Sequence, residues 1–337
     1  MQPTFMQRSP TRRTIILVVA VLLALGAFRS LIFGYPINPI FRDAFTVPNG
    51  ASATRIAVML EEAGLIPDAD LFITAVRLKG GTRSIRPGRY LLVNVRTVGD
   101  LTRQILQPDW RPIVVFVPEG ATRDLVPQYF AAKYPTDVEH FLALTEDRDF
   151  MTRLGISMAP HMEGYLLPET YHISNGLTEE GIIEQMVALT LKTLGEQIIA
   201  KGARLGLNPH EILTMASIVE GEAMLDEERG VISAVYHNRL RRGMRLQADP
   251  TVQYALPDGP RRLFLRDYKY PSAYNTYLHK GLPPGPINNP GRASILAAVM
   301  PSDVDYLYFV ANGEGGHIFT QTFDEHTKAI SRIRSGD

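Results

Sequence analysis

An uncharged, strongly apolar stretch near the N-terminus constrains what this chain can fold into. Thr14–Phe28 carries no ionisable side chain, and after Arg29 the apolar character resumes through Phe33. Counted across that interruption, the stretch has about 20 residues, the length that an α-helix needs to cross a bilayer. We predict a transmembrane anchor at 14–33 and a cytoplasmic tail at 1–13, so that the globular part of the chain begins only after the span.

The charges beside the span predict its orientation. Arg8, Arg12 and Arg13 precede it, and the side of a span with the excess of Lys and Arg is the cytoplasmic side. We expect a single-pass protein of the cytoplasmic (inner) membrane with its N-terminus inside and the rest outside, in a periplasmic or extracytoplasmic space. The alternative is a cleaved signal peptide, because Ala24-Leu25-Gly26 resembles a cleavage site. Both interpretations export the rest of the chain.

Composition excludes several classes of function. The 337 residues carry a formal net charge of zero, so nothing supports a nucleic-acid partner. The chain has no Cys, which excludes thiolate chemistry and Cys-ligated metal sites. It contains no H-E-x-x-H, nucleophile-elbow, phosphate-loop or dinucleotide-binding pattern. We therefore expect neither a metal nor another cofactor.

The segment 38–110 has the pattern of a small α/β unit. Turn residues and apolar spacing predict a strand at Phe45–Val47, a helix capped by Ser52, a helix that begins at Asp68 or Asp70, and a strand after Pro87-Gly88. This order of strand, helix, helix and strand resembles a LysM module, a type of domain that binds glycans containing N-acetylglucosamine. A further helix is expected at Thr97–Leu106.

From a boundary near Trp110 onward the pattern is mixed. Ile113–Val117 is a continuous apolar run, which predicts a strand buried on both faces. Helices are expected over Leu177–Ala200 and from Pro209 to Glu220, and Tyr306–Val310 is predicted to pair with the segment around His317. We expect an α+β arrangement around a sheet assembled late in the chain.

The segment Met215–Glu222, MASIVEGE, places a carboxylate at the end of an apolar helical run. Desolvation of Glu220 would raise its pKa, as a general acid near neutral pH requires. The alternative is a structural carboxylate held by an arginine such as Arg239. The loops that follow are rich in amides, tyrosines, prolines and glycines, which suit a neutral polyhydroxylated ligand better than a phosphate.

These residues resemble the endolytic murein transglycosylase family (YceG-like, the membrane-bound lytic transglycosylases of type G). The matching pieces run in order from about Glu163 to Phe323: EGY with PETY, ASIVEGE, NRLRRGMRLQADPTVQY, AYNTYLHKGLPPGPINNPG and YLYFVANGEGGHIF. The resemblance implies an α+β protein with a transmembrane helix, a LysM-like βααβ subdomain at 38–110 and a mixed α+β catalytic domain at 111–330.

The resemblance also implies an activity. It places the family's catalytic carboxylate at Glu220. The enzyme would cleave the β-1,4 bond between N-acetylmuramic acid and N-acetylglucosamine of nascent peptidoglycan. The same carboxylate would then deprotonate the C6 hydroxyl of the muramyl sugar, which would leave a 1,6-anhydro end and terminate strand elongation. The implied partners are glycan strands, the inner membrane and the cell-wall synthesis machinery. Two alternatives remain: hydrolysis by water with Asp249 or Glu163 as base, and a non-catalytic glycan-binding scaffold.

The other candidate site residues are predicted to contact substrate. They are Glu163, Gln247, Asp249, Tyr274, Asn275, Tyr277 and Asn289. Each has a structural alternative: Glu163 could cap the turn that follows it, Asp249 could cap the helix that Thr251 begins, and the tyrosines could belong to the core. His317 is more typical of a turn histidine than of a catalyst.

A reporter fused after Asp337 should be active outside the cytoplasm, because the arginine-rich flank precedes the span. Alkaline phosphatase and green fluorescent protein fusions, which work on opposite sides of the membrane, would measure this. A mature N-terminus near Ala27 would instead identify a cleaved signal peptide.

Overall fold

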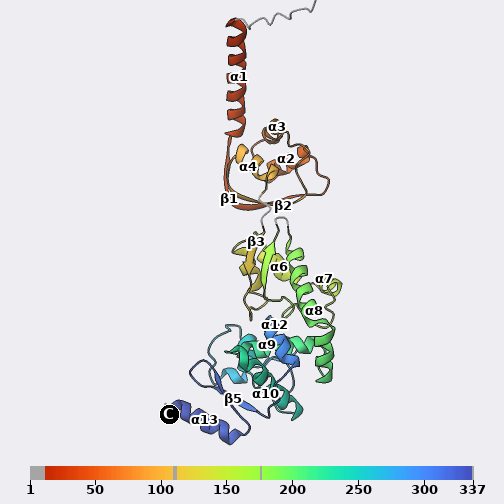
Figure 1. Ribbon diagram of the computed structural model, residues 1–337, viewed down its shortest axis with the longest axis vertical. Coiled ribbons are helices and arrows are strands. Elements are labelled where there is room, and N and C mark those ends of the chain that lie inside the picture. Colours follow the sequence, from red (N-terminus) through yellow and green to blue (C-terminus); the bar gives the residue numbers. More distant parts are fainter. Residues whose placement is uncertain (1–11, 109–111, 175–176, 336–337) are drawn as a thin grey trace, which may run out of the picture. The chain divides into compact units, whose positions relative to one another are not determined.

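The computed structural model describes residues 12–108, 112–174 and 177–335, without the side chains of 41–43. The predicted tail lies mostly outside the described residues, as does the predicted boundary at Trp110. The chain forms two compact units (Figure 1): Met1–Pro112 with Ser174–Leu177, and Ile113–Ile173 with Thr178–Asp337.

The first unit joins a long apolar helix to a small α/β fold. Its elements are α1 (Arg12–Phe33), β1 (Pro36–Val47), α2 (Ala53–Glu62), α3 (Ala69–Leu78), β2 (Gly88–Thr97) and α4 (Val98–Leu106). β1 and β2 pair antiparallel. The predicted starts of both middle helices are confirmed, since the side chains of Ser52 and Asp68 accept hydrogen bonds from backbone N–H groups of the first turn. The strand–helix–helix–strand order is confirmed, whereas the LysM-like identity of the region stays a prediction.

Helix α1 has 22 residues, none of them buried among the described residues. At the helical rise it is about 33 Å long, slightly more than a bilayer's hydrocarbon core. In the described part of the chain it is the one helix long and apolar enough to cross a membrane. A signal sequence also meets these criteria of length and composition.

The second unit is mostly helical. Its elements are β3 (Ile113–Phe116), α5 (Val126–Ala131), α6 (Val138–Leu144), α7 (Arg148–Arg153), β4 (Thr170–Ile173), α8 (Glu179–Arg204), α9 (Pro209–Glu222), η1 (Asp226–Glu228), α10 (Arg229–Arg241), α11 (Asp249–Ala255), η2 (Asp267–Lys269), α12 (Arg292–Val299), β5 (Tyr308–Ala311), β6 (His317–Thr320) and α13 (Phe323–Ser335). α8 bends at Gly195.

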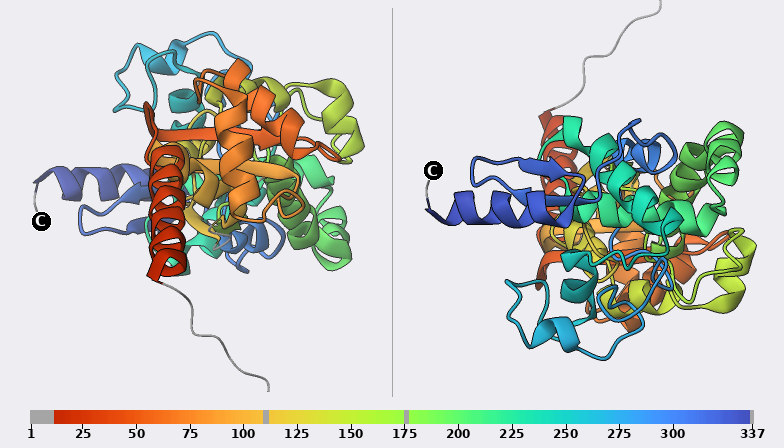
Figure 2. Two further views of the ribbon diagram at one scale, coloured as in Figure 1. Left: turned by 90° about the horizontal axis from the view of Figure 1, so that it is seen from above. Right: turned by 90° about the horizontal axis from the view of Figure 1, so that it is seen from below.

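Two expectations about the strands are wrong. The described residues form three separate two-stranded sheets, β1–β2, β3–β4 and β5–β6, instead of one sheet assembled late. β3 is not buried on both faces: Val114 is 44% exposed and Phe116 60% exposed, because only the alternate side chains reach the core. The predicted pairing of β5 with β6 is confirmed, and α13 lies along this hairpin (Figure 2).

Helix α9 is the centre of the second unit. Asn208 and Glu211 form a capping box around its first turn, and Pro209 occupies a position where its missing N–H costs nothing. Almost every residue from His210 to Val219 is buried, and α12 packs along the helix. The helix continues to Glu222, two residues beyond the predicted end at Glu220. Two carboxylates therefore stand on its last turn.

Candidate active site

The carboxylates of Glu220 and Glu222 have different surroundings. Two residues along an α-helix turn by about 200°, so the two side chains leave α9 on nearly opposite sides. One enters a network of ion pairs, and the other enters a cavity.

Glu220 is held by donors of the protein itself. Its Oε1 accepts a hydrogen bond of 3.1 Å from Nη1 of Arg229, and its Oε2 accepts one of 2.9 Å from the backbone N–H of Gly291. The side chain of Glu220 is only 7% exposed, and that of Arg229 only 10%. The contact joins α9 to α10 and to the loop before α12. Both oxygens of Glu220 are therefore used within the fold.

Arg229 is the partner that the sequence did not reveal. It also contacts Asp226 at 3.1 Å and Glu119 at 3.6 Å, and it donates to the hydroxyl of Ser294. The suggestion that Arg239 holds Glu220 is wrong. Arg239 instead donates to the backbone carbonyls of Leu307 and Leu246, because it lies on another part of α10.

Glu119 is a second residue that sequence reasoning missed. It follows β3 and lies against Gly291, where any side chain would collide with its carboxylate. Burial raises the pKa of Glu119, and the negative charge of Glu220 raises it further. Its position directly after a predicted strand, in Pro118-Glu119-Gly120, was the available signal.

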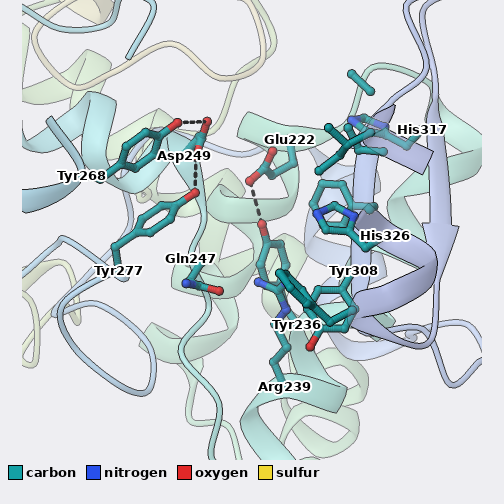
Figure 3. Close-up of a pocket in the computed structure, with 15 residues that line it drawn as sticks. Glu222, Tyr236, Arg239, Gln247, Asp249, Tyr268, Tyr277, Tyr308, His317 and His326 are labelled. Carbon is teal, nitrogen blue, oxygen red and sulfur yellow. Dashed lines mark hydrogen bonds between the residues drawn. The ribbon is translucent and has the colours of Figure 1, made fainter. Parts of the chain in front are cut away.

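Glu222 opens onto a cavity of about 550 Å³ (Figure 3). The cavity is lined by Glu222, Tyr236, Arg239, Gln247, Asp249, Tyr268, Tyr277, Tyr308, Phe309, Val310, Ala311, His317, Phe323, His326 and Ile330. Oε1 of Glu222 accepts a hydrogen bond of 2.7 Å from the Tyr236 hydroxyl. Burial is the main cause that raises the pKa of Glu222 to about 7, and the charge of Asp249 adds to it.

Asp249 faces the same cavity from the start of α11. Its Oδ1 accepts a hydrogen bond of 2.6 Å from Tyr277, and its Oδ2 accepts one of 3.3 Å from Tyr268. The two tyrosine rings lie 4.6 Å apart. The residue that caps α11 is Ala248, so the Asp249 carboxylate serves the cavity and not the helix start.

His317 and Gln247 complete the polar lining. Glu228 accepts a hydrogen bond of 2.7 Å from the backbone N–H of His317, and its other oxygen lies 2.7 Å from Nδ1 of that histidine. A carboxylate accepts here, so Nδ1 carries the proton. Gln247 has a φ of 49°, an uncommon conformation for a residue with a side chain, next to the start of α11.

Of the predicted substrate contacts, the structure brings Gln247, Asp249 and Tyr277 together around this cavity. Asn275 and Asn289 are fully buried, and their amides hold backbone groups of neighbouring loops. The ring of Tyr274 packs 5.0 Å from that of Tyr254. Contact between substrate and Tyr274, Asn275 or Asn289 stays a prediction that this geometry does not favour.

Glu163 lines a second cavity, of about 340 Å³. Its Oε1 accepts hydrogen bonds from the backbone N–H of Arg123 at 2.9 Å and from Asn289 at 3.2 Å. Burial raises the pKa of Glu163 to about 8, against the opposing effect of the Arg123 N–H. Among the described residues that line the two cavities, Glu220 does not occur.

In the part of the chain that the structure describes, no group of three or more His, Cys, Asp or Glu residues could hold a metal ion. The residues missed by sequence reasoning at the first cavity are Glu222, Tyr236, Tyr268 and Arg239. The signal for Glu222 was its place beside Glu220 in MASIVEGE, where helical periodicity puts the two on different faces.

Comparison with known proteins gives concordant matches. The model of the YceG-like family matches residues 45–332. A protein of Bacillus subtilis (strain 168) named endolytic murein transglycosylase is 31% identical over 319 residues, which cover 89% of this chain and 88% of the relative. A protein of the same name from Streptococcus pneumoniae serotype 2 is 29% identical over 357 residues, covering 94% of this chain and 64% of the relative. A solved structure of a yceG-like protein from Listeria monocytogenes has a TM-score of 0.61 and 32% identity, and covers 85% of this chain and 98% of that one.

Replacing Arg229 by Met should destabilise the second unit by about 3–5 kcal/mol, because it leaves the Glu220 carboxylate buried without its cation. Chemical denaturation followed by circular dichroism would measure the loss. The matched control is Arg266→Met. Arg266 is 81% exposed and 3.8 Å from Asp267, so its removal should cost about 1 kcal/mol at most. Equal losses in the two variants would contradict the structural role of the Arg229 ion pair.

Proposed function

Because this chain belongs to the YceG-like family, we propose that it is a membrane-anchored lytic transglycosylase acting on peptidoglycan. The bond cleaved is the β-1,4 link between N-acetylmuramic acid and N-acetylglucosamine of nascent strands. The named relatives support the class of enzyme. The observation that carries the chemistry is Glu222, whose pKa of about 7 and place in an aromatic cavity match what a general acid needs.

The reaction needs one carboxyl group that acts twice. Protonated Glu222 donates its proton to the glycosidic oxygen as the C1–O bond breaks, and the N-acetylglucosamine side leaves as an alcohol. The resulting carboxylate then takes the proton of the muramyl C6 hydroxyl, whose oxygen attacks C1. The product is a 1,6-anhydro end, and no water is consumed. The nucleophile belongs to the substrate, so the second catalytic carboxylate of ordinary glycosidases is not required.

The geometry favours Glu222 over Glu220 as this acid. Glu222 lines the cavity, whereas both oxygens of Glu220 accept hydrogen bonds from Arg229 and Gly291. Glu220 is then a positioning residue that holds the last turn of α9. The assignment of catalysis to Glu220 remains a prediction, and a comparison of the two amide variants decides between them.

The surroundings of Glu222 suit a sugar ring. Tyr268 and Tyr277 supply aromatic surface, and Gln247 and Arg239 supply polar groups. Helix α1 would hold the enzyme at the outer face of the inner membrane, near newly made strands and the machinery that makes them. Cutting a strand there would end its elongation, and the small fold at 38–110 would add glycan binding.

Hydrolysis by water is the second candidate. It is favoured by one observation, the presence of two carboxylates, Glu222 and Asp249, in the same cavity. In that case Asp249 would act as the base that activates water.

Glu222→Gln should lower the turnover of purified sacculi by about 10²–10⁴, because the amide is close in shape but cannot supply or accept the proton. The wild-type rate should fall as pH rises through about 7, where Glu222 loses its proton. Released muropeptides, separated by chromatography, measure the rate.

The matched variant Glu220→Gln should retain more activity but unfold more easily, since it breaks the pair with Arg229. A folded, inactive Glu220→Gln protein beside an active Glu222→Gln protein would return catalysis to Glu220.

The product distinguishes transglycosylation from hydrolysis. Transglycosylation gives a 1,6-anhydromuramyl end that is lighter by one water than the hydrolytic product. Reaction in ¹⁸O-labelled water, followed by mass spectrometry, should show no label at the new muramyl end. Label at C1 would establish hydrolysis and replace the leading proposal.

A further inference from the structure

The loop Asp258–Lys269, which follows α11, leaves two adjacent apolar side chains in solvent. Phe264 is 55% exposed and Leu265 is 87% exposed. The segment that contains this loop, drawn in light blue, projects from the edge of the second unit in both views of Figure 2. Single exposed apolar residues are common on protein surfaces, whereas an adjacent pair on a projecting loop is a candidate contact site.

Bonds within the loop hold this apolar pair in place. Asp267 is 5% exposed and accepts two hydrogen bonds from the guanidinium of Arg261, at 2.7 and 3.1 Å. It also accepts one of 2.7 Å from the backbone N–H of Phe264. The buried amide of Asn275 donates to the carbonyl of Tyr268 at 3.2 Å and ties the loop to the rest of the unit. The apolar pair is therefore displayed by a fixed turn.

The charges of the loop are predominantly positive. It carries four basic and two acidic side chains, in a chain whose net charge is zero. Both acidic side chains are paired with Arg261, at 2.8 and 2.7 Å. Arg266 is 81% exposed and lies farther from Asp267, at 3.8 Å. Arg262 and Lys269 are exposed as well. Three cations of the loop therefore face solvent together with the apolar pair.

This combination matches the surface of an anionic bilayer, where apolar side chains enter the interface and Lys and Arg contact lipid phosphates. The guanidinium of Arg266 lies 5.7 Å from the centre of the Phe264 ring, so charge and apolar surface are neighbours. A soluble polyanion would use the cations and gain nothing from Leu265. Helix α1 is long and apolar enough to cross a membrane, and such a tether lets a weak second contact form.

We propose that the loop Asp258–Lys269 docks on the anionic membrane surface, with Phe264 and Leu265 in the interface and the three cations against lipid phosphates. The loop borders both cavities, because Tyr268 lines the first and Gly259 lines the second. Docking holds both cavities beside the lipid surface. This inference goes beyond the proposed function, since it concerns a second membrane contact and does not depend on which bond the protein cleaves.

The absence of Cys from the sequence allows one dye to be placed on the loop. Full-length Leu265→Cys protein, labelled with a fluorescent dye, is reconstituted into vesicles of phosphatidylcholine and phosphatidylglycerol that contain nitroxide-labelled acyl chains. The matched control is Met158→Cys, at a side chain that is 65% exposed on another loop of the same unit. Nitroxide quenching should be at least about threefold stronger at position 265, and this difference should disappear in vesicles of phosphatidylcholine alone.

Removal of the exposed cations tests the same contact without changing a buried residue. Replacing Arg262, Arg266 and Lys269 together by Gln should weaken the quenching at position 265 at least about threefold, because each cation near an anionic surface adds to binding. The matched control replaces three exposed cations elsewhere in the second unit by Gln, namely Arg153, Lys192 and Arg204. It should leave the quenching unchanged.

Equal quenching at positions 265 and 158 would overturn the inference. So would quenching at position 265 that persists without phosphatidylglycerol, or that persists without the three cations of the loop. The proposed function is judged separately, from the fragments that active protein releases from sacculi, because the docking measurement contains no glycan.

Discussion

The buried contact of Glu220 with Arg229 and Gly291 is the interaction on which the candidate site depends. It ties the last turn of α9 and the first turn of α10 to the loop before α12, which lies 71 residues further along the chain. Removing two charges from water is costly. The cost is offset here by close hydrogen-bond geometry and by two additional partners of Arg229, which are Asp226 and Ser294. The position of this turn fixes Gly221 and Glu222, and with them the walls of both cavities.

The same helical turn therefore supports two different kinds of carboxylate. Glu220 leaves α9 toward a guanidinium and a backbone N–H, so its oxygens serve the fold. Glu222 leaves toward aromatic side chains, where burial outweighs the Tyr236 hydrogen bond and the charge of Arg239 and raises its pKa to about 7. In the proposed function, a difference of two positions in the sequence thus separates a positioning carboxylate from the reacting one.

Sequence reasoning succeeded where the cause of a structure is local. Ser52 and Asp68 begin helices because their side chains accept from nearby N–H groups, and the turn between β5 and β6 follows from its glycines. It failed where the cause lies far along the chain. The open face of β3 follows from what covers that strand, and the contact between Glu220 and Gly291 joins residues that no periodicity relates. The apolar run before Glu220 correctly predicted a helix that is buried as far as Val219, but it could not show which of two nearby carboxylates meets a cation.

The hydrogen bonds of Asp249 also bear on the choice between transglycosylation and hydrolysis. Each of its oxygens accepts a hydrogen bond from a tyrosine hydroxyl, Tyr277 on one and Tyr268 on the other. Each oxygen keeps a second lone pair, so these two bonds orient the carboxylate without excluding it as a base. Asp249 can also place a negative charge near the positive charge that develops on the sugar ring, while the aromatic walls limit the entry of water. A substrate hydroxyl that is already attached to the reacting sugar then has the advantage of proximity over any solvent molecule.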